Sequence, residues 1–359
     1  MEHKHMLILV LGLISASVTS ILCFMICVCR RRRSPKEDES SDIEASLEFK
    51  ERDDEFGMEE LIKFGGGENL GIYDILEAPG EVIGKSGYGT LYRASLVRID
   101  GVGLLRFLRP ACTGRMREVV GVIELLGSVR HPNLVPLVAF YAGPRGEKLL
   151  VHPFYGCGTL AQFIRDGNEN AHKWTIIQRI SIGIVQGIDY LHTGMEKPIL
   201  HGNLKSKNIL LDRNYQPHVS DFGLYLLLNP TAGQEMLEAS SAQGYKAPEL
   251  IKMKDVSEET DIYSLGVILL EILTGKDPVS EKPTAPQDFY LPNFMRKAIL
   301  DHRIMDLYHP EIVLGHESPV IEERILKFAQ LALACCSPSP SLRPDIKQVL
   351  RKLEEIGEK

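Results

Sequence analysis

HGNLKSKN at residues 201–208, followed by DFG at residues 221–223, is the stretch that decides the fold of this 359-residue chain. Taken alone, these two motifs are weak evidence for any fold, because an aspartate such as Asp221 is a turn residue in most sequences. The informative feature is the order of the short motifs around it. IGKSGYGTLY at residues 83–92 and LLRFL at 104–108 precede it, and GYKAPE at 244–249, DIYSLG at 261–266 and RP at 343–344 follow it.

This ordered series resembles the signature set of protein kinases. The sequence between the motifs resembles the plant leucine-rich-repeat receptor-like kinase group, in particular its transmembrane kinase-like, inactive members. The segments that carry this second resemblance are LIKF at 61–64, EVIG at 81–84, RHPNLVPL at 130–137 and residues 174–192.

The resemblance implies an α+β, bilobal protein-kinase-like fold at residues 61–355. We expect a single transmembrane helix to precede it. The small β-rich N-lobe is expected at about 77–153 and the larger helical C-lobe at about 154–355. The leucine-rich ectodomain that the family usually carries has no room in this chain.

Composition sets broad limits on function. A hydrophobic content of 44% is ample for a sizeable core. The net charge of -7 argues against nucleic acid as a partner of the whole chain. Seven cysteines without a framework spacing favour a reducing compartment and free thiols, and no Cys/His cluster has the spacing of zinc ligands.

Residues 6–28 are almost continuously apolar and are followed by four arginines at 30–33. At about 1.5 Å per residue this stretch spans a hydrocarbon core of about 30 Å. The arginines place the bulk of the chain in the cytoplasm and residues 1–5 outside it, so we expect a single-pass protein, in the plasma membrane by resemblance. The alternative is a cleaved signal peptide, since residues 16–20 have the small side chains of a cleavage site.

Residues 29–60 are polar and strongly acidic, and we expect a flexible juxtamembrane linker there. Ser40 and Ser41 lie among acids and are either phosphorylation sites or plain linker residues. Cys27 and Cys29 beside the arginines are either palmitoylated or ordinary apolar residues.

The family's pattern breaks where a carboxylate should receive the proton of the substrate hydroxyl. That position is Asn203, and a carboxamide is a very poor proton acceptor near neutral pH. Gly202 stands where the resemblance expects the arginine that pairs with activation-loop phosphates.

The strand lysine that grips the α- and β-phosphates maps by resemblance to Arg106. The charge is kept, but a planar fork replaces a slim ammonium. The helix glutamate that should pair with it maps to Val122. Glu124, two residues later, would point away from Arg106. Glu118, one turn earlier, could substitute for the missing glutamate. We expect both acids to be solvated instead.

Two further changes affect the degenerate nucleotide pocket. Leu104, two residues before Arg106, occupies a position that is small in active relatives, and overpacking of this kind costs about 1–3 kcal/mol. Pro153, after His152 in the hinge, lacks a backbone donor. The other residues assigned to the pocket are Gly84, Gly87 and Gly89 of the glycine-rich turn, in which Ser86 replaces the middle glycine, together with Leu91 and Leu210.

Other positions match the family. Asn208 and Asp221 are the Mg²⁺-ligand positions, and Lys205 is the cation of the catalytic loop. Glu249 and Arg343 are placed to form the pair that ties the large lobe together. The stacked column between the lobes corresponds to Leu126, Leu137, His201 and Phe222, with Asp261 at its base.

The sequence therefore predicts a membrane-anchored receptor-like pseudokinase, a scaffold or allosteric partner of other receptor-like kinases or cytoplasmic signalling proteins. It is expected to bind ATP and Mg²⁺ weakly or not at all. One alternative is a weakly active Ser/Thr kinase that uses Mg-ATP, because phosphoryl transfer is largely electrostatic. Another is a truncated receptor chain that pairs with a full-length partner through residues 6–28.

Overall fold

The computed structural model describes residues 59–96, 101–251, 255–280, 290–303, 306, 308–312 and 319–357. The membrane helix predicted at 6–28 and almost all of the linker predicted at 29–60 lie outside these residues. Among the described residues, none of the helices has the length and apolar character needed to cross a bilayer.

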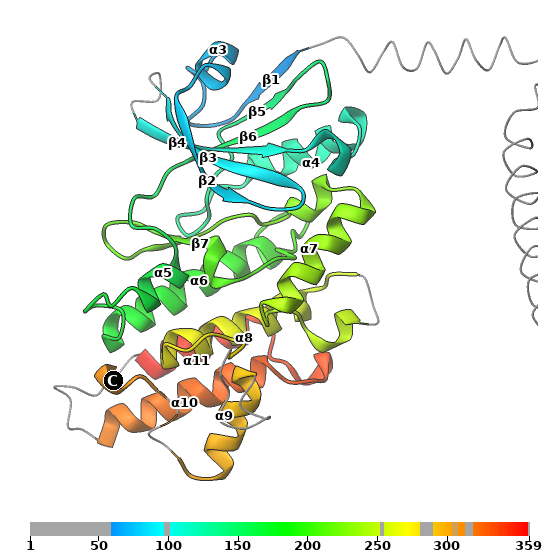
Figure 1. Ribbon diagram of the computed structural model, residues 1–359. Helices are drawn as coiled ribbons and strands as arrows, with labels where there is room; N and C mark the ends of the chain where they lie inside the picture. The colour runs from blue at the N-terminus through cyan, green and yellow to red at the C-terminus, as the bar shows by residue number, and fades with distance from the viewer. Residues whose placement is uncertain are drawn as a thin grey trace, which may run out of the picture. The chain divides into compact units, whose positions relative to one another are not determined.

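The small lobe is a six-stranded antiparallel sheet in the order β1-β5-β6-β4-β3-β2 (Figure 1). Helix α4 (Met116–Ser128) lies between β4 and β5 in the chain, after the short 3₁₀ turn η2 (Pro110–Cys112). The strands are β1 (Glu60–Lys63), β2 (Gly80–Lys85), β3 (Gly89–Leu96), β4 (Gly101–Leu108), β5 (Ala139–Ala142) and β6 (Lys148–Pro153).

This lobe begins earlier than the boundary near residue 77 that the sequence predicts. Strand β1 pairs with β5, and the short helix α3 (Ile72–Leu76) follows it. The buried Leu70 and Ile75 of this segment join Leu96 and Leu105 of the sheet in a small separate core. The segment belongs to the lobe because it covers apolar side chains on the outer face of the sheet.

The large lobe is helical, and the predicted bilobal α+β architecture is confirmed (Figure 1). It also contains one β-hairpin, β7 (Ile209–Leu211) with β8 (Pro217–Val219), which carries the two motifs that the sequence singled out at either end. The helices are α5 (Leu160–Arg165), α6 (Trp174–Thr193), α7 (Pro230–Ala242), α8 (Glu258–Thr274), α9 (Leu291–Leu300), α10 (Pro319–Cys335) and α11 (Ile346–Gly357), and the 3₁₀ turns are η3 (Ser206–Asn208), η4 (Leu224–Leu227), η5 (Pro248–Ile251), η8 (Pro310–Ile312) and η9 (Pro340–Leu342).

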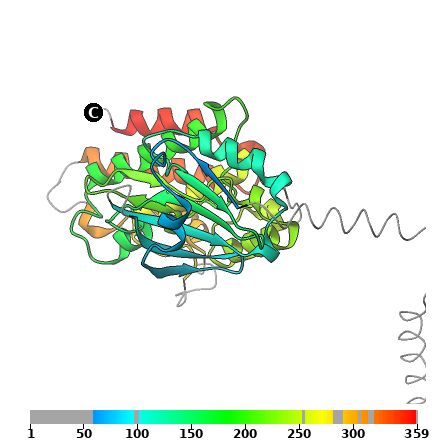
Figure 2. The same cartoon turned by 90° about the horizontal axis from the view of Figure 1, so that it is seen from above.

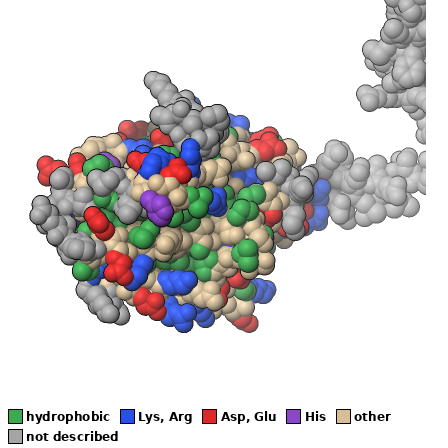
Figure 3. Space-filling model, turned by 90° about the horizontal axis from the view of Figure 1, so that it is seen from below, with side chains coloured by type: hydrophobic (Ala, Val, Ile, Leu, Met, Phe, Trp, Pro, Cys, Tyr) green, Lys and Arg blue, Asp and Glu red, His purple; other side chains and the backbone are tan. Residues whose placement is uncertain are grey.

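Seen from above, the strands of the small lobe lie over the helices of the large lobe (Figure 2). On the face seen from below, acidic and basic side chains are intermixed with apolar and neutral ones (Figure 3). The described part of that face therefore presents no extended field of one sign.

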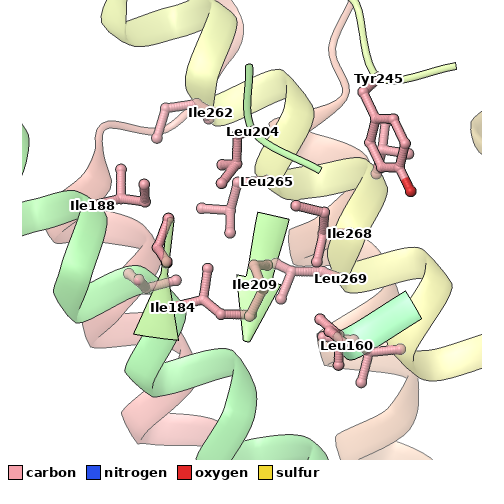
Figure 4. Close-up of a cluster of buried hydrophobic side chains, with 14 of the residues drawn as sticks. Leu160, Ile184, Ile188, Leu204, Ile209, Tyr245, Ile262, Leu265, Ile268 and Leu269 are labelled. Atoms are coloured by element: carbon pink, nitrogen blue, oxygen red, sulfur yellow. The ribbon is translucent and has the colours of Figure 1, made fainter. Parts of the chain in front are cut away.

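Helix α8 is the centre of the large lobe. Every residue from Thr260 to Thr274 is buried, as expected of a helix that is apolar all round. Figure 4 shows Leu204 and Ile209, which flank the polar loop, beside Leu265 of α8, with Ile184 of α6 nearby. The core therefore holds both ends of the polar segment 205–208, and Asn203 lies directly before that segment.

Helices α8 and α10 approach closely at Gly266. A Cβ added there would lie 2.7 Å from the Cβ of Cys335 and 2.7 Å from the Sγ of Cys336. Gly121 in α4 offers the opposite case, since a Cβ there would meet nothing within 4 Å.

We predict opposite effects of the same substitution at these two helical glycines. Gly266→Ala should lower the free energy of unfolding by about 1–3 kcal/mol through overpacking. Gly121→Ala should raise it by up to about 1 kcal/mol, because alanine favours the helix. Urea denaturation followed by circular dichroism measures both, and equal changes in the two variants would contradict the close approach of α8 to α10.

Candidate functional site

One face of the small-lobe sheet carries the residues assigned to the nucleotide pocket. On β4, Leu104 lies opposite Arg93 of β3 and His152 of β6. Arg106 lies opposite Leu91 and Leu150. Because directly paired residues share a face and side chains alternate along a strand, Leu104, Arg106, Leu91 and His152 all face the same side.

The central contact of the cleft joins the two lobes. Nη2 of Arg106 on β4 lies 2.7 Å from both Oδ1 and Oδ2 of Asp221, in the turn after β8. The two side chains are only 11% and 9% exposed. Asp221 has a φ of 64°, so the backbone at this turn takes the left-handed conformation that aims the carboxylate. Both carboxylate oxygens are thereby bonded to a cation of the protein itself.

The sequence assigned Arg106 to phosphates and Asp221 to a metal ion, and did not foresee that they bind each other. Two signals pointed that way: the fork of an arginine reaches farther than an ammonium, and its helix partner is missing. Val122 is half-buried against the core. Glu124 and Glu118 are exposed, and Glu118 accepts a hydrogen bond from the backbone of Arg115 at 2.9 Å. Neither acid pairs with Arg106.

The catalytic-loop position is closed to solvent. Asn203 is 3% exposed, and neither atom of its amide group has a hydrogen-bond partner among the described residues. Its backbone carbonyl accepts a hydrogen bond from Nδ2 of the buried Asn208 at 3.0 Å. The loop is fixed from below by Asp261, which accepts hydrogen bonds from the backbone of His201 at 2.6 Å and of Gly202 at 2.9 Å.

Lys205 lies half-buried in the same loop. Burial lowers the pKa of its ammonium, and the nearby Asp221 opposes this effect. The loop therefore keeps a cation close to the Arg106–Asp221 pair.

The glycine-rich turn between β2 and β3 inserts a side chain into the cleft. Tyr88 is 7% exposed and belongs to the main buried apolar cluster. Burial raises the pKa of its phenol, and the negative charge of Asp221 adds to the effect. Its hydroxyl end is thus within electrostatic range of the ion pair, in the space beneath the turn. The sequence treated this turn as a cover for phosphates and gave no role to Tyr88.

A helix in the segment after DFG lies against the small lobe. Asn229 caps α7, accepting a hydrogen bond from the backbone of Ala232 at 3.0 Å. The Asn229 side chain also donates to the carbonyl of Ala111 at 2.8 Å, and its backbone donates to Cys112 at 2.9 Å. Farther along α7, Glu235 comes so close to the glycine-rich turn that a Cβ on Gly87 would lie 2.9 Å from its carboxylate. The cap followed by proline is a helix-start signal that could have been read from the sequence.

The hinge side of the cleft is also occupied by protein atoms. Nδ1 of His152 donates a hydrogen bond to the carbonyl of Pro136 at 3.0 Å. Burial lowers the pKa of this imidazole to about 4. A cavity of about 440 Å³ opens at the outer edge of the hinge, away from the ion pair, and is lined by Val102, Phe154, Tyr155, Gly156, Asp212 and Arg213.

The structure places the remaining assigned residues as follows. Arg343 donates to both carboxylate oxygens of Glu249, at 2.6 and 2.8 Å. A Cβ on Gly223 would lie 2.7 Å from Leu126. Leu126, Leu137, His201 and Phe222 are all buried, whereas Leu91 and Leu210 are half-buried and Gly84, Gly87 and Gly89 lie in or beside the turn between β2 and β3.

Residues 79–353 match the protein kinase domain family. The kinase-like protein TMKL1 of Arabidopsis thaliana is 37% identical over 97% of this chain and 52% of its own length. A second Arabidopsis protein, named "Probable inactive receptor kinase RLK902", is 34% identical over 84% of this chain and 46% of its own length. The chain spans about half the length of these curated relatives.

Two solved structures are similar to this chain. The kinase domain of maize sucrose-induced receptor kinase 1, bound to AMP-PNP, is 30% identical with a TM-score of 0.73, covering 83% of this chain and 100% of that one. The pseudokinase domain of BIR2, described as an immune regulator, is 28% identical with a TM-score of 0.65, covering 87% and 93%.

We predict strong thermodynamic coupling across the Arg106–Asp221 pair. Arg106→Met should lower the free energy of unfolding by about 3–5 kcal/mol, because it leaves a buried carboxylate unpaired. Arg106→Met combined with Asp221→Asn should recover much of that loss. Arg93→Met is the matched control: its ion pair with Glu81 is exposed, so its loss should cost less than about 1 kcal/mol. Additive effects of the two cleft substitutions, by urea denaturation, would contradict the pair.

We also predict a pH dependence that His152 carries. The folded-state pKa of His152 lies near 4, below the ordinary value of 6.5, so between these values the unfolded chain binds a proton that the folded chain excludes. The contribution of His152 to the free energy of unfolding is thus complete above pH 6.5 and declines, by about 3 kcal/mol in all, as the pH falls toward 4.

Urea denaturation as a function of pH tests this. His152→Asn should flatten the decline between pH 6.5 and 4, whereas His302→Asn, a change at an exposed histidine, should leave it as in the natural chain. If both variants keep the natural slope, His152 is not the proton-excluding group.

Proposed function

We propose that this chain, which belongs to the protein kinase family, is a receptor-like pseudokinase that acts as a membrane-anchored signalling scaffold or allosteric partner. The observation that carries the proposal is the ion pair between Arg106 and Asp221, with Nη2 at 2.7 Å from both carboxylate oxygens. It joins the residue at the phosphate-gripping position to the residue at the metal-ligand position.

The ion pair fits poorly with bound Mg-ATP. A magnesium ion is held by carboxylate oxygens, and both oxygens of Asp221 are already bonded to a guanidinium. To bind the metal, the carboxylate would first have to leave this largely desolvated cation, which would then be buried without a partner. We infer that Mg-ATP binds weakly or not at all.

The remaining space of the pocket supports the same conclusion. Leu104 is 6% exposed on the face that would receive adenine, and Tyr88 is buried beneath the glycine-rich turn. Overpacking of a filled site costs about 1–3 kcal/mol, and each 1.4 kcal/mol weakens binding about tenfold.

The proton-acceptor position supports it independently. Asn203 is uncharged and nearly fully buried, so it has neither the basicity nor the access that a base for a substrate hydroxyl needs. The names of two similar proteins, an inactive receptor kinase and a pseudokinase, agree with a loss of phosphotransfer. We extend to this chain the expectation of a single-pass membrane anchor at 6–28, a cytoplasmic kinase-like domain, and partners among receptor-like kinases or cytoplasmic signalling proteins.

A weakly active Ser/Thr kinase is the second candidate. Lys205, Asn208 and Asp221 stand at their family positions, and a similar maize kinase domain binds AMP-PNP. For this reading the Arg106–Asp221 pair has to open when nucleotide arrives.

We predict that the full-length chain in detergent micelles shows no rise in melting temperature with Mg-ATP and incorporates no labelled phosphate. Arg106→Lys combined with Leu104→Ala should gain a Mg-ATP-dependent thermal shift, because the shorter lysine loosens the contact with Asp221 and the alanine empties the adenine face. Leu104→Ala alone is the control for simple cavity formation.

The decisive comparison uses phosphate incorporation from labelled ATP. Incorporation by the natural chain that disappears in Asp221→Ala would establish the weakly active kinase and refute the pseudokinase. Incorporation that persists in Asp221→Ala marks a contaminating kinase, so the assay is run on both proteins side by side.

A further inference from the structure

Three potential metal ligands meet in the large lobe, among residues that the cleft does not use. His172 lies between α5 and α6, and His309 and Glu311 lie at η8. One nitrogen of each imidazole and a carboxylate oxygen all lie within 4.8 Å of one another. No sequence motif indicates this cluster, because its members lie in distant segments of the chain that only the fold brings together.

A backbone hydrogen bond ties the cluster to the centre of the large lobe. His309 donates its backbone N–H to the carbonyl of Leu273, near the end of α8, at 2.8 Å. Gly275, which ends α8 with a φ of +70°, lies beneath both imidazoles: a Cβ there would be 3.1 Å from His309 and 3.3 Å from His172. The absence of a side chain at Gly275 is what lets the two rings come together.

His172 is an unusual residue for a core position. It is 7% exposed, and its Nδ1 has no hydrogen-bond partner among the described residues. A buried ring nitrogen without a partner costs about 1–3 kcal/mol, so a ligand that bound it would remove a real penalty.

The two imidazoles stack face to face. Their centroids are 3.5 Å apart with an angle of 10° between the planes. Two imidazolium ions would repel each other at this separation, and burial of His172 together with the neighbouring His309 lowers the pKa of His172. A neutral imidazole offers the lone pair that a metal ion requires.

We propose that His172, His309 and Glu311 bind one divalent transition-metal ion of the Zn²⁺ type. Two histidines and a glutamate are a ligand set that zinc accepts, with metal–ligand distances of about 2.0–2.2 Å. Atoms within 4.8 Å of one another can surround such an ion once the stacked rings turn so that their lone pairs converge. Because Glu311 is exposed, the fourth position is open to water or to a ligand from a partner.

The site would act on the fold rather than on phosphate chemistry. The bound ion would fasten the segment that leads into α6 to the segment at η8, beside the end of α8. Stability gained this way depends on the free metal concentration, since the ion binds the folded chain.

The test uses the full-length chain in detergent micelles, stripped with chelator and then titrated with Zn²⁺ by isothermal calorimetry. The N-terminal histidines and cysteines are further zinc-binding groups, so stoichiometry is compared between variants. The natural chain should bind one more ion than His172→Ala or Glu311→Gln, and His302→Asn, which alters an exposed histidine outside the cluster, should bind as the natural chain does.

Two more measurements make the result specific to this cluster. Zn²⁺ should raise the melting temperature of the natural chain and of His302→Asn, but should do so much less in Glu311→Gln, whose exposed substitution leaves the core intact. Co²⁺ should give the visible absorption of a nitrogen- and oxygen-bound ion, weakened at least about tenfold at equal metal concentration in His172→Ala. Equal stoichiometry in all variants, or a natural chain without the Zn²⁺-dependent shift, would show a metal-free stacked pair and overturn the proposal.

Discussion

The cleft of this protein depends on one interaction, the ion pair between Arg106 of the sheet and Asp221 of the turn after β8. A buried ion pair adds little net stability compared with apolar side chains, but breaking it exposes the chain to the full cost of an unpaired buried charge. The ion pair therefore holds strand β4 and the turn after β8 in one relative position. The sequence assigns this cation to phosphates and this carboxylate to a metal ion, whereas in the structure each binds the other.

The surrounding side chains are consistent with a cleft that is complete without a ligand. Tyr88 of the glycine-rich turn and Leu104 of β4 are both buried. His152 is held neutral by burial at the hinge, so it adds no further charge beside the pair. Asn229 bonds α7 to the loop before α4, which keeps the segment after DFG against the small lobe. Each of these residues is therefore buried or hydrogen-bonded to other protein atoms.

The sequence was sufficient for the architecture but not for the contacts inside it. The order of the motifs and the apolar helix α8 carry the bilobal fold, since burial of continuous apolar surface leaves few alternatives. The Arg106–Asp221 contact depends on side-chain reach across the interlobe space, which no local pattern encodes. The cluster of His172, His309 and Glu311 was missed for a related reason: its members are far apart in the chain and only tertiary packing joins them. The start of helix α7 could have been predicted from the sequence, because Asn229 followed by proline is a helix-start signal.

The Arg106–Asp221 ion pair also affects what Asn203, at the position assigned to the proton acceptor, could do. A carboxylate at residue 203 could accept a proton only from a hydroxyl that already faces a bound γ-phosphate. With Asp221 bonded to Arg106, the metal that would place that phosphate has no free carboxylate at this position. Defects that act as a unit are not additive, so a change at Asn203 has little effect while the ion pair persists. We infer that the order of dependence runs from the ion pair to the nucleotide and only then to the base. The kinase fold does not depend on that order, because Asp261, Glu249 and Arg343 stabilise the large lobe through contacts within the protein.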